Sequence, residues 1–214
     1  MSITSEPTYD PFIAEATAGG GGDYEAPPSG TKPACIIGVF DLGHQPSSYQ
    51  GVAEDKHQVA FLFELAAKQK NGKPFVLPQR YNFTLGEDSN LSKFIGTVVG
   101  KRPKPGELVN LKHLVSLPCL LTIEHKSGSD KRGNPRTYAN ITNVTGYPEG
   151  MPIPTHTVTP VVFSVRANQP FPDGLDWLPR LFGLTFRELC EGSREIRQRS
   201  LLKQNTDGDG DIPF

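Results

Sequence analysis

Two runs of alternating apolar and polar side chains, separated by Asn71-Gly72, constrain the fold of this 214-residue chain more than any other feature. The apolar positions are Val59, Phe61, Phe63 and Leu65 in the first run and Phe75, Leu77, Tyr81, Phe83 and Leu85 in the second. Alternation of this kind is the period of a half-buried strand, and Asn-Gly is a strong hairpin turn signal. The chain also holds 22 Gly and 20 Pro, which argues against a helical bundle. We therefore predict an antiparallel hairpin, residues 57–67 and 74–85, within a mainly β protein.

Other segments have strand patterns as well. Strands are predicted at 31–42, where Gly38 allows a bend, and at 119–125 and 138–144. The polar stretches 43–56 and 126–137 are predicted to be loops.

One segment, between the hairpin and the last two strands, has the pattern of a short helix. Ser89 or Asn90 could cap it, and Gly100 and Pro103 would end it. Its apolar side would consist of Leu91, Phe94, Ile95 and Val98.

The order of three strands, a short helix and two strands resembles that of the OB-fold, a five-stranded barrel with its helix between strands three and four. A closed barrel of five short strands would also leave no exposed edge. A small β-sandwich or an SH3-like barrel would produce similar local patterns, and both stay open as alternatives.

Composition divides the chain into four parts. Residues 1–26, with Gly19 to Gly22, are predicted to be a flexible acidic arm, and 27–150 the barrel domain. Residues 151–200 are predicted to be a C-terminal extension with one strand at 161–166 and helical residues within 176–199. Residues 201–214 are predicted to be a disordered acidic tail.

The formal net charge of −1 conceals an uneven distribution. Residues 1–26 hold five acids and no Lys or Arg, and the last nine residues hold three aspartates and no base. The body, residues 27–205, has 22 bases against 15 acids, a net charge of +7. A basic body between acidic ends suits an anionic partner for the body and a different partner for an end.

The three cysteines, Cys35, Cys119 and Cys190, are widely spaced and are expected to be reduced and buried. No export signal and no apolar stretch of membrane-spanning length is seen, so we expect a cytoplasmic protein without membrane contact.

Neither a metal nor another cofactor is expected, because no phosphate loop, HExxH pair or zinc spacing occurs. The run Asp207-x-Asp209-x-Asp211 lacks the glycine of a calcium loop. The chain is therefore predicted not to be an enzyme, with a metal-dependent nuclease as the less favoured alternative.

Basic and aromatic residues occur together in the predicted barrel, the combination that binds single-stranded nucleic acid without reading its sequence. In OB-folds the face of strands two and three and the loops joining strands one to two and four to five form the usual ligand site. Phe61, Phe63 and Phe83 alternate as core residues do, while Tyr81 and Tyr138 suit either the core or a base. The residues predicted to bind single-stranded DNA are Tyr49, Lys70, Lys73, Arg80, Tyr81, Phe83, Lys126, Lys131, Arg132, Arg136 and Tyr138.

The chain ends in Asp207-Gly-Asp209-Gly-Asp211-Ile212-Pro213-Phe214. Phe214 carries a ring and an α-carboxylate on one residue, which suits a small apolar pocket beside a basic side chain. The last four residues resemble the tip of bacterial single-stranded DNA-binding proteins.

Further motifs extend the likeness: Asp41-Leu-Gly-His-Gln45, Tyr49-Gln-Gly51, Phe63-Glu-Leu65, Tyr81-Asn-Phe-Thr-Leu85 and Pro118-Cys-Leu-Leu-Thr-Ile-Glu-His125. With them the chain resembles the OB-fold single-stranded DNA-binding proteins of tailed bacteriophages. Where related sequences often have Trp-Arg-Gly after the helix, this chain has Thr97-Val-Val-Gly100 and keeps only the glycine.

The resemblance implies coating of single strands in the cytoplasm of a bacterial host, and recruitment of replication, recombination or repair proteins by the tail. A homo-oligomer is possible. An RNA-binding or strand-annealing protein would share every charge argument and stays an alternative, as does a decoy that uses the tail alone.

Overall fold

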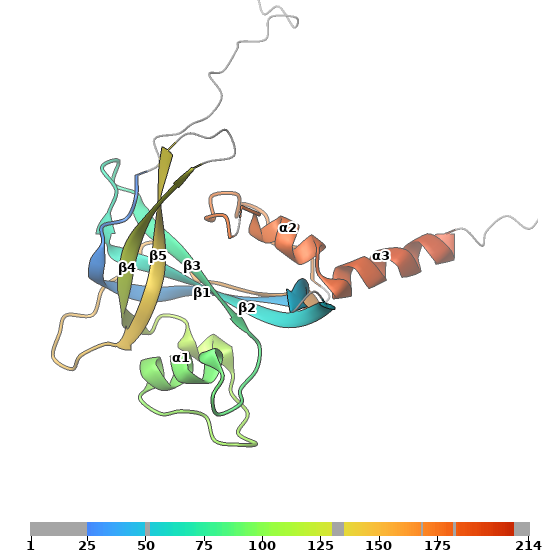
Figure 1. Ribbon diagram of the computed structural model, residues 1–214, viewed down its shortest axis with the longest axis horizontal. Helices are drawn as coiled ribbons and strands as arrows, with labels where there is room; N and C mark the ends of the chain where they lie inside the picture. The colour runs from blue at the N-terminus through green and yellow to red at the C-terminus, as the bar shows by residue number, and fades with distance from the viewer. Residues whose placement is uncertain (1–24, 50–51, 130–134, 168, 182, 208–214) are drawn as a thin grey trace, which may run out of the picture.

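The computed structural model describes residues 25–49, 52–129, 135–167, 169–181 and 183–207. The protein is mainly β, as predicted (Figure 1). Its strands are β1 (Gly30–Tyr49), β2 (Val52–Lys68), β3 (Pro74–Asn82), β4 (Pro118–Ser129), β5 (Pro135–Gly146) and β6 (Val161–Ser164). Its helices are α1 (Asn90–Val99), α2 (Phe186–Glu191) and α3 (Arg194–Asp207), with short 3-10 turns η1 (Leu111–Leu114) and η2 (Val165–Ala167).

The predicted hairpin and helix are both present. Strand β2 ends at Lys68 and β3 begins at Pro74, and Gly72 in the turn between them has a φ of 81°. Ser89, one of the two predicted caps, accepts a hydrogen bond from the backbone N–H of Ser92 at the start of α1. Gly100 ends the helix in the left-handed conformation.

The prediction of a polar loop at 43–56 is wrong. Strands β1 and β2 stay paired from His44↔His57 to Tyr49↔Val52, so this stretch is the end of a long hairpin. Strands β4 and β5 likewise continue past their predicted ends, from Lys126↔Tyr138 to Ser129↔Pro135. Ladder hydrogen bonds join backbone groups, so a projecting two-stranded arm needs no apolar side chains to stay paired.

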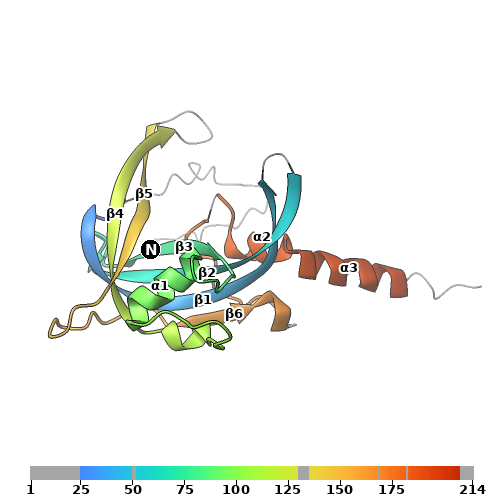
Figure 2. The ribbon, with the colours of Figure 1, turned by 60° about the horizontal axis from the view of Figure 1, so that its bottom comes forward.

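The sheet has the order β3-β2-β1-β4-β5, and β6 lies parallel to β1 beside Gly38 to Asp41. The predicted closed five-stranded barrel is not confirmed: a sixth strand is present, and among the described residues no ladder joins β3 to β5. Helix α1 lies at this opening, where Phe94 contacts the rings of Phe61 and Tyr81. Figure 2 shows the sheet curling so that the β4–β5 hairpin and the end of the β1–β2 hairpin rise on the same side.

Two hydrophobic cores lie on opposite faces of β1 and β2, because alternate side chains of a strand point to opposite faces. The first lies between the curled sheet and α1 and includes Phe61 and Phe63, both fully buried as predicted. The second joins Phe40 and Leu62 to Phe186 of α2 and to β6. The C-terminal extension therefore covers the outer face of β1 and β2.

Beyond β5 the chain crosses the sheet before reaching β6, the strand predicted at 161–166. We call residues 147–157 the strap. Helix α3 then projects from the body (Figure 1) and continues to Asp207, so residues 201–207 of the predicted disordered tail are helical. The predictions for the N-terminal arm up to residue 24 and for the tip, 208–214, concern residues outside the described part of the chain. None of the described helices is long and apolar enough to cross a membrane.

Candidate functional site

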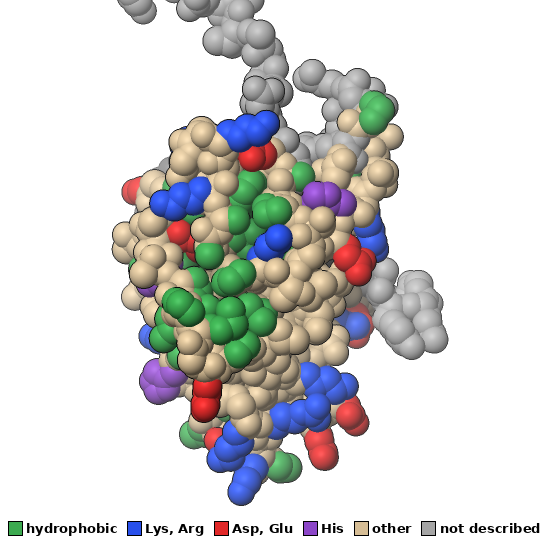
Figure 3. Space-filling view, turned by 90° about the vertical axis from the view of Figure 1, so that its left-hand side faces the viewer, with side chains coloured by type: hydrophobic (Ala, Val, Ile, Leu, Met, Phe, Trp, Pro, Cys, Tyr) green, Lys and Arg blue, Asp and Glu red, His purple; other side chains and the backbone are tan. Residues whose placement is uncertain are grey.

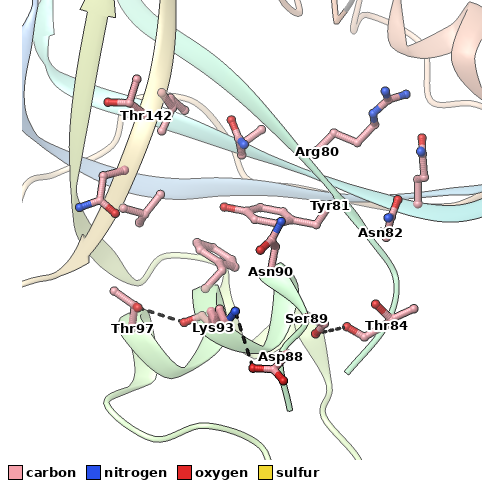
Figure 4. A pocket seen from close by; sticks show the side chains of 16 residues that line it. Arg80, Tyr81, Asn82, Thr84, Asp88, Ser89, Asn90, Lys93, Thr97 and Thr142 are labelled. Carbon is pink, nitrogen blue, oxygen red and sulfur yellow. Dashed lines mark hydrogen bonds and ion pairs between the residues drawn. The ribbon is translucent and has the colours of Figure 1, made fainter. Parts of the chain in front are cut away.

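An open groove of about 780 Å³ lies between β3 and β5, with α1 as its floor (Figure 4). We call it the seam groove, because it occupies the gap that closure of a barrel would fill. Its walls come from the end of β3 and from residues 141–144 of β5, and Gln58 of β2 contributes at one end. Polar side chains dominate the lining.

One face of helix α1 forms the floor of the groove. Positions 90, 93, 94 and 97 lie on one helical face, and Asn90, Lys93, Phe94 and Thr97 all line the groove. The helix begins there because the Ser89 side chain caps the Ser92 N–H and its hydroxyl donates to the Thr84 carbonyl oxygen at 2.7 Å. Leu91 and Ile95 turn inward and fix the helix to the first core.

Tyr81 links the groove to the core. Its ring stacks on that of Phe94 at 4.9 Å between centroids, and Phe61 meets it edge-on at 5.9 Å. Burial raises the pKa of the Tyr81 hydroxyl far above its usual range, so it stays a neutral donor at every pH of interest. One face of the predicted stacking residue is thus occupied by Phe94.

Amide side chains give the groove its hydrogen-bonding capacity. Each amide both donates and accepts, as base edges and sugars do. Gln58 is only 6% exposed, and its Oε1 has no hydrogen-bond partner among the described residues. The five amides that line the groove are Gln58, Gln79, Asn82, Asn90 and Asn143.

The charge of the groove is weakly positive. Arg80 and Lys93 line it together with a single carboxylate, Asp88, whose Oδ1 lies 3.9 Å from Lys93 Nζ. Partial burial lowers the pKa of Arg80. In Figure 4 the Arg80 side chain extends from β3 away from Tyr81, because neighbouring strand residues point to opposite faces.

The other predicted site residues fall into separate places. Lys70 and Lys73 are exposed in the β2–β3 turn, at the opposite end of β3 from the groove. A nine-residue strand spans about 30 Å, so the structure does not bring these lysines to the groove. Phe83 is half-buried: its ring stacks on His57 at 4.4 Å, and Arg166 lies 5.5 Å from its centroid.

The β4–β5 hairpin carries Lys126 and Tyr138, which pair across the ladder and are both exposed. The Tyr138 ring lies against Gly128, and its hydroxyl donates to the Ser129 carbonyl oxygen at 3.0 Å. Arg136 pairs with Gly128, but its side chain, like those of Tyr49 and Asp207, is outside the described residues. So are all of Lys131, Arg132, Asp209, Asp211, Ile212, Pro213 and Phe214.

A second polar cluster, which the sequence did not reveal, joins the extension to the sheet. The Asp41 carboxylate accepts hydrogen bonds from His57 at 2.6 Å, from Arg166 at 2.7 Å and from Ser164 at 2.7 Å. Glu195 of α3 accepts from the backbone N–H of His44 at 2.9 Å and pairs with the His44 ring. The cluster holds β6, η2 and α3 against the β1–β2 hairpin.

Burial would raise the pKa of Asp41, but hydrogen bonds from His57, Arg166 and Ser164 together lower it well below its usual range. Burial and the His44 hydrogen bonds act on Glu195 in the same opposed way, and the net effect lowers its pKa. Among the described residues no group of three or more His, Cys, Asp and Glu side chains is placed to hold a metal ion.

Sequence reasoning found Arg80 and Tyr81 of the seam groove and missed its α1 side. The helical spacing of Asn90, Lys93 and Thr97 is the sequence signal that places all three on one side of the helix, opposite the apolar face that predicts its core contacts. No protein-family model matches the chain, and no curated protein matches it.

Proposed function

We propose that this chain is a non-catalytic, sequence-tolerant single-stranded DNA-binding protein of OB-like architecture. The strand order, with α1 between β3 and β4, supports the architecture, since the OB-fold is a partly open Greek-key barrel. The seam between β3 and β5 would then be the open part of such a barrel.

One observation carries the functional proposal: the seam groove brings a tyrosine, a lysine and several amides to one opening at the edge of β3, and Arg80 extends from the same strand toward its other face. Cations contact phosphates, and amides and rings contact bases without demanding a particular sequence. The outer face of β1 and β2 is not open to a ligand, because α2 and β6 pack on it in the second core. A bound strand would therefore follow the β3 edge and the groove toward the exposed Lys126 and Tyr138 of the β4–β5 hairpin.

Charge reversal at Lys93 tests the groove. Lys93 is exposed on α1, and its one ion pair within the described part of the chain is the 3.9 Å contact with Asp88, so Lys93→Glu should fold normally. We expect it to weaken binding of a fluorescent oligothymidine about tenfold in an anisotropy titration, because a phosphate contact becomes a repulsion. Lys112→Glu, an exposed lysine of η1 outside the groove, is the matched control and should bind within about twofold of wild type.

The wild-type affinity should fall with salt at a log–log slope of about −0.7 for each phosphate contacted. Equal affinity for duplex and single strands would refute the proposal. Binding that is unchanged in Lys93→Glu would refute the groove as the site. A parallel titration with oligouridine separates this function from RNA binding.

The acidic end of the chain is proposed to recruit replication, recombination or repair proteins and to compete with DNA for the basic body. Deleting residues 208–214 should raise affinity for a short single-stranded oligonucleotide and abolish capture of partner proteins, because it removes Asp209, Asp211 and the Phe214 ring. Unchanged behaviour in both assays would contradict this role.

A further inference from the structure

A second hollow, of about 400 Å³, lies between the strap and the end of β2. We call it the strap pocket. Its volume falls within the range of small-ligand sites, which is about 300–1,000 Å³. Its apolar lining consists of Pro33, Ala66, Met151, Pro152, Ile153 and Pro154, and Lys68 is the one charged residue of the lining.

The strap forms one wall of the pocket, and hydrogen bonds at both of its ends fix its position. The buried Glu64 carboxylate accepts hydrogen bonds from the backbone N–H and hydroxyl of Thr157, each at 2.8 Å, and from the Val158 N–H at 2.9 Å. At the other end of the strap the Tyr147 hydroxyl donates to the Pro152 carbonyl oxygen at 2.5 Å. Prolines at 152 and 154 further restrict the backbone.

The apolar side chains at the pocket are open to solvent. Ile153 is 67% exposed and Met151 is 43% exposed. Lys68, at the end of β2, lies beside them, and the exposed Lys70 and Lys73 follow in the β2–β3 turn. An apolar hollow lined by one lysine, with two more lysines in the adjoining turn, suits a ligand that joins an apolar group to anionic groups.

We propose that the strap pocket binds the C-terminal tip of a second copy of this chain. The tip has the complementary chemistry: Ile212, Pro213 and Phe214 are apolar, and Asp209 and Asp211 precede them. The ring of Phe214 would enter the pocket, while the aspartates approach Lys68 and the lysines of the adjoining turn, Lys70 and Lys73.

Chain length decides that the tip comes from another copy. Seven residues follow Asp207, and fully extended they reach about 25 Å, little more than the roughly 21 Å length of α3 itself. The end of α3 and the strap lie at opposite ends of the molecule in Figures 1 and 2, with the whole sheet between them. Figure 3 views the molecule from the side opposite α3, where hydrophobic side chains gather beside Lys and Arg.

A tip that docks away from its own helix makes a head-to-tail contact, which joins copies in a row wherever the rotation between neighbours does not close a ring. If the seam groove binds single-stranded DNA as proposed above, such a row would make coating of a long strand cooperative. The docking itself does not depend on DNA.

A peptide-binding experiment tests the pocket. The receptor is the full chain with Phe214→Ala, so that its own tip does not compete, and the probe is a fluorescent peptide of residues 206–214. We expect saturable binding that falls about tenfold with Ile153→Ser and about fivefold with Lys68→Glu in the receptor. Ile153 and Lys68 are exposed, so both variants should fold. Lys112→Glu in the receptor is the control and should leave the affinity unchanged.

The peptide with Phe214→Ala should not bind. Sedimentation velocity of the wild-type chain should show self-association that grows with concentration and is lost in Ile153→Ser. Equal binding of the wild-type and Phe214→Ala peptides would overturn the proposal. It would also be overturned if Lys93→Glu in the receptor weakened peptide binding and Lys68→Glu did not, because the tip would then bind at the seam groove. Ile153→Ser should still bind a short oligothymidine with wild-type affinity. The experiment therefore distinguishes a failure of tip docking from a failure of the proposed DNA binding.

Discussion

Replacing Asp41 with Asn tests whether the buried carboxylate holds the C-terminal extension to the sheet. The side chain is about the same size, but it loses the charge that receives hydrogen bonds from His57, Arg166, Ser164 and the Gly43 N–H. Hydrogen bonds to a charged group contribute about 1.5–3 kcal/mol each, and Arg166 is half exposed, which reduces its share. We expect Asp41→Asn to lower the free energy of unfolding by about 3 kcal/mol at pH 7. For a chain of this size the melting temperature should fall by about 6–12 °C.

The pH dependence gives a second measure of the same carboxylate. Its pKa is lowered in the folded protein, so its stabilisation is complete above the unfolded value near 3.9 and declines as pH falls below it. In urea unfolding followed by circular dichroism, the difference between wild type and Asp41→Asn should shrink by roughly 1 kcal/mol between pH 5 and pH 3. Asp88→Asn, whose carboxylate is fully exposed, is the control and should unfold at the wild-type midpoint. A difference below about 1 kcal/mol at pH 7, or one that grows toward pH 3, would refute the reasoning.

Two other predictions concern the attachment of the extension. Gly43→Ala should destabilise the protein by about 2–3 kcal/mol and expose α3 to proteolysis, because φ is +67° and the new Cβ would lie 2.6 Å from Val165 Cγ2 and even closer to Glu195. Gly72→Ala, with φ of +81° and no atom within 4 Å, should cost only about 1 kcal/mol, and equal costs in denaturant unfolding would contradict the steric argument. Glu64→Gln should speed hydrogen exchange at the Thr157 and Val158 amides, because a neutral amide oxygen replaces the charged acceptor of three donors. Unchanged protection at these two amides, measured by NMR, would show that the strap is held by other contacts.

Apolar periodicity and turn residues predicted the centre of the sheet. Alternation around Phe61 and the Asn71-Gly72 turn placed the β2–β3 hairpin, and the Ser89 cap and Gly100 bounded α1. These signals are local, since a period or a cap is complete within a few residues. The two projecting hairpins were missed because their backbone pairing leaves no apolar pattern to detect, as at His44↔His57.

Long-range contacts explain the rest. Ser164 and Arg166 both lie more than 120 residues from Asp41 in sequence, and they meet it only because β6 lies beside β1. The sequence predicted only one side of the groove, because the other side also depends on a long-range contact. The strand pattern predicts Tyr81 and Arg80, whereas Lys93 lines the same groove only because α1 packs across the open seam. Which strand edges remain unpaired is a property of the whole sheet, so no local pattern predicts it.

The second core bears on where this chain can be cut. A fragment that ended near Gly150 would keep every strand of the predicted barrel domain, yet it would expose Phe40, Ile37 and Leu62 on the outer side of β1 and β2. Strands with apolar side chains on both faces need a cover on each. The shortest piece that folds alone should therefore extend through Ile196 of α3, which packs against the same core, so that the last 18 residues, and not the last 64, are the natural unit to remove or replace.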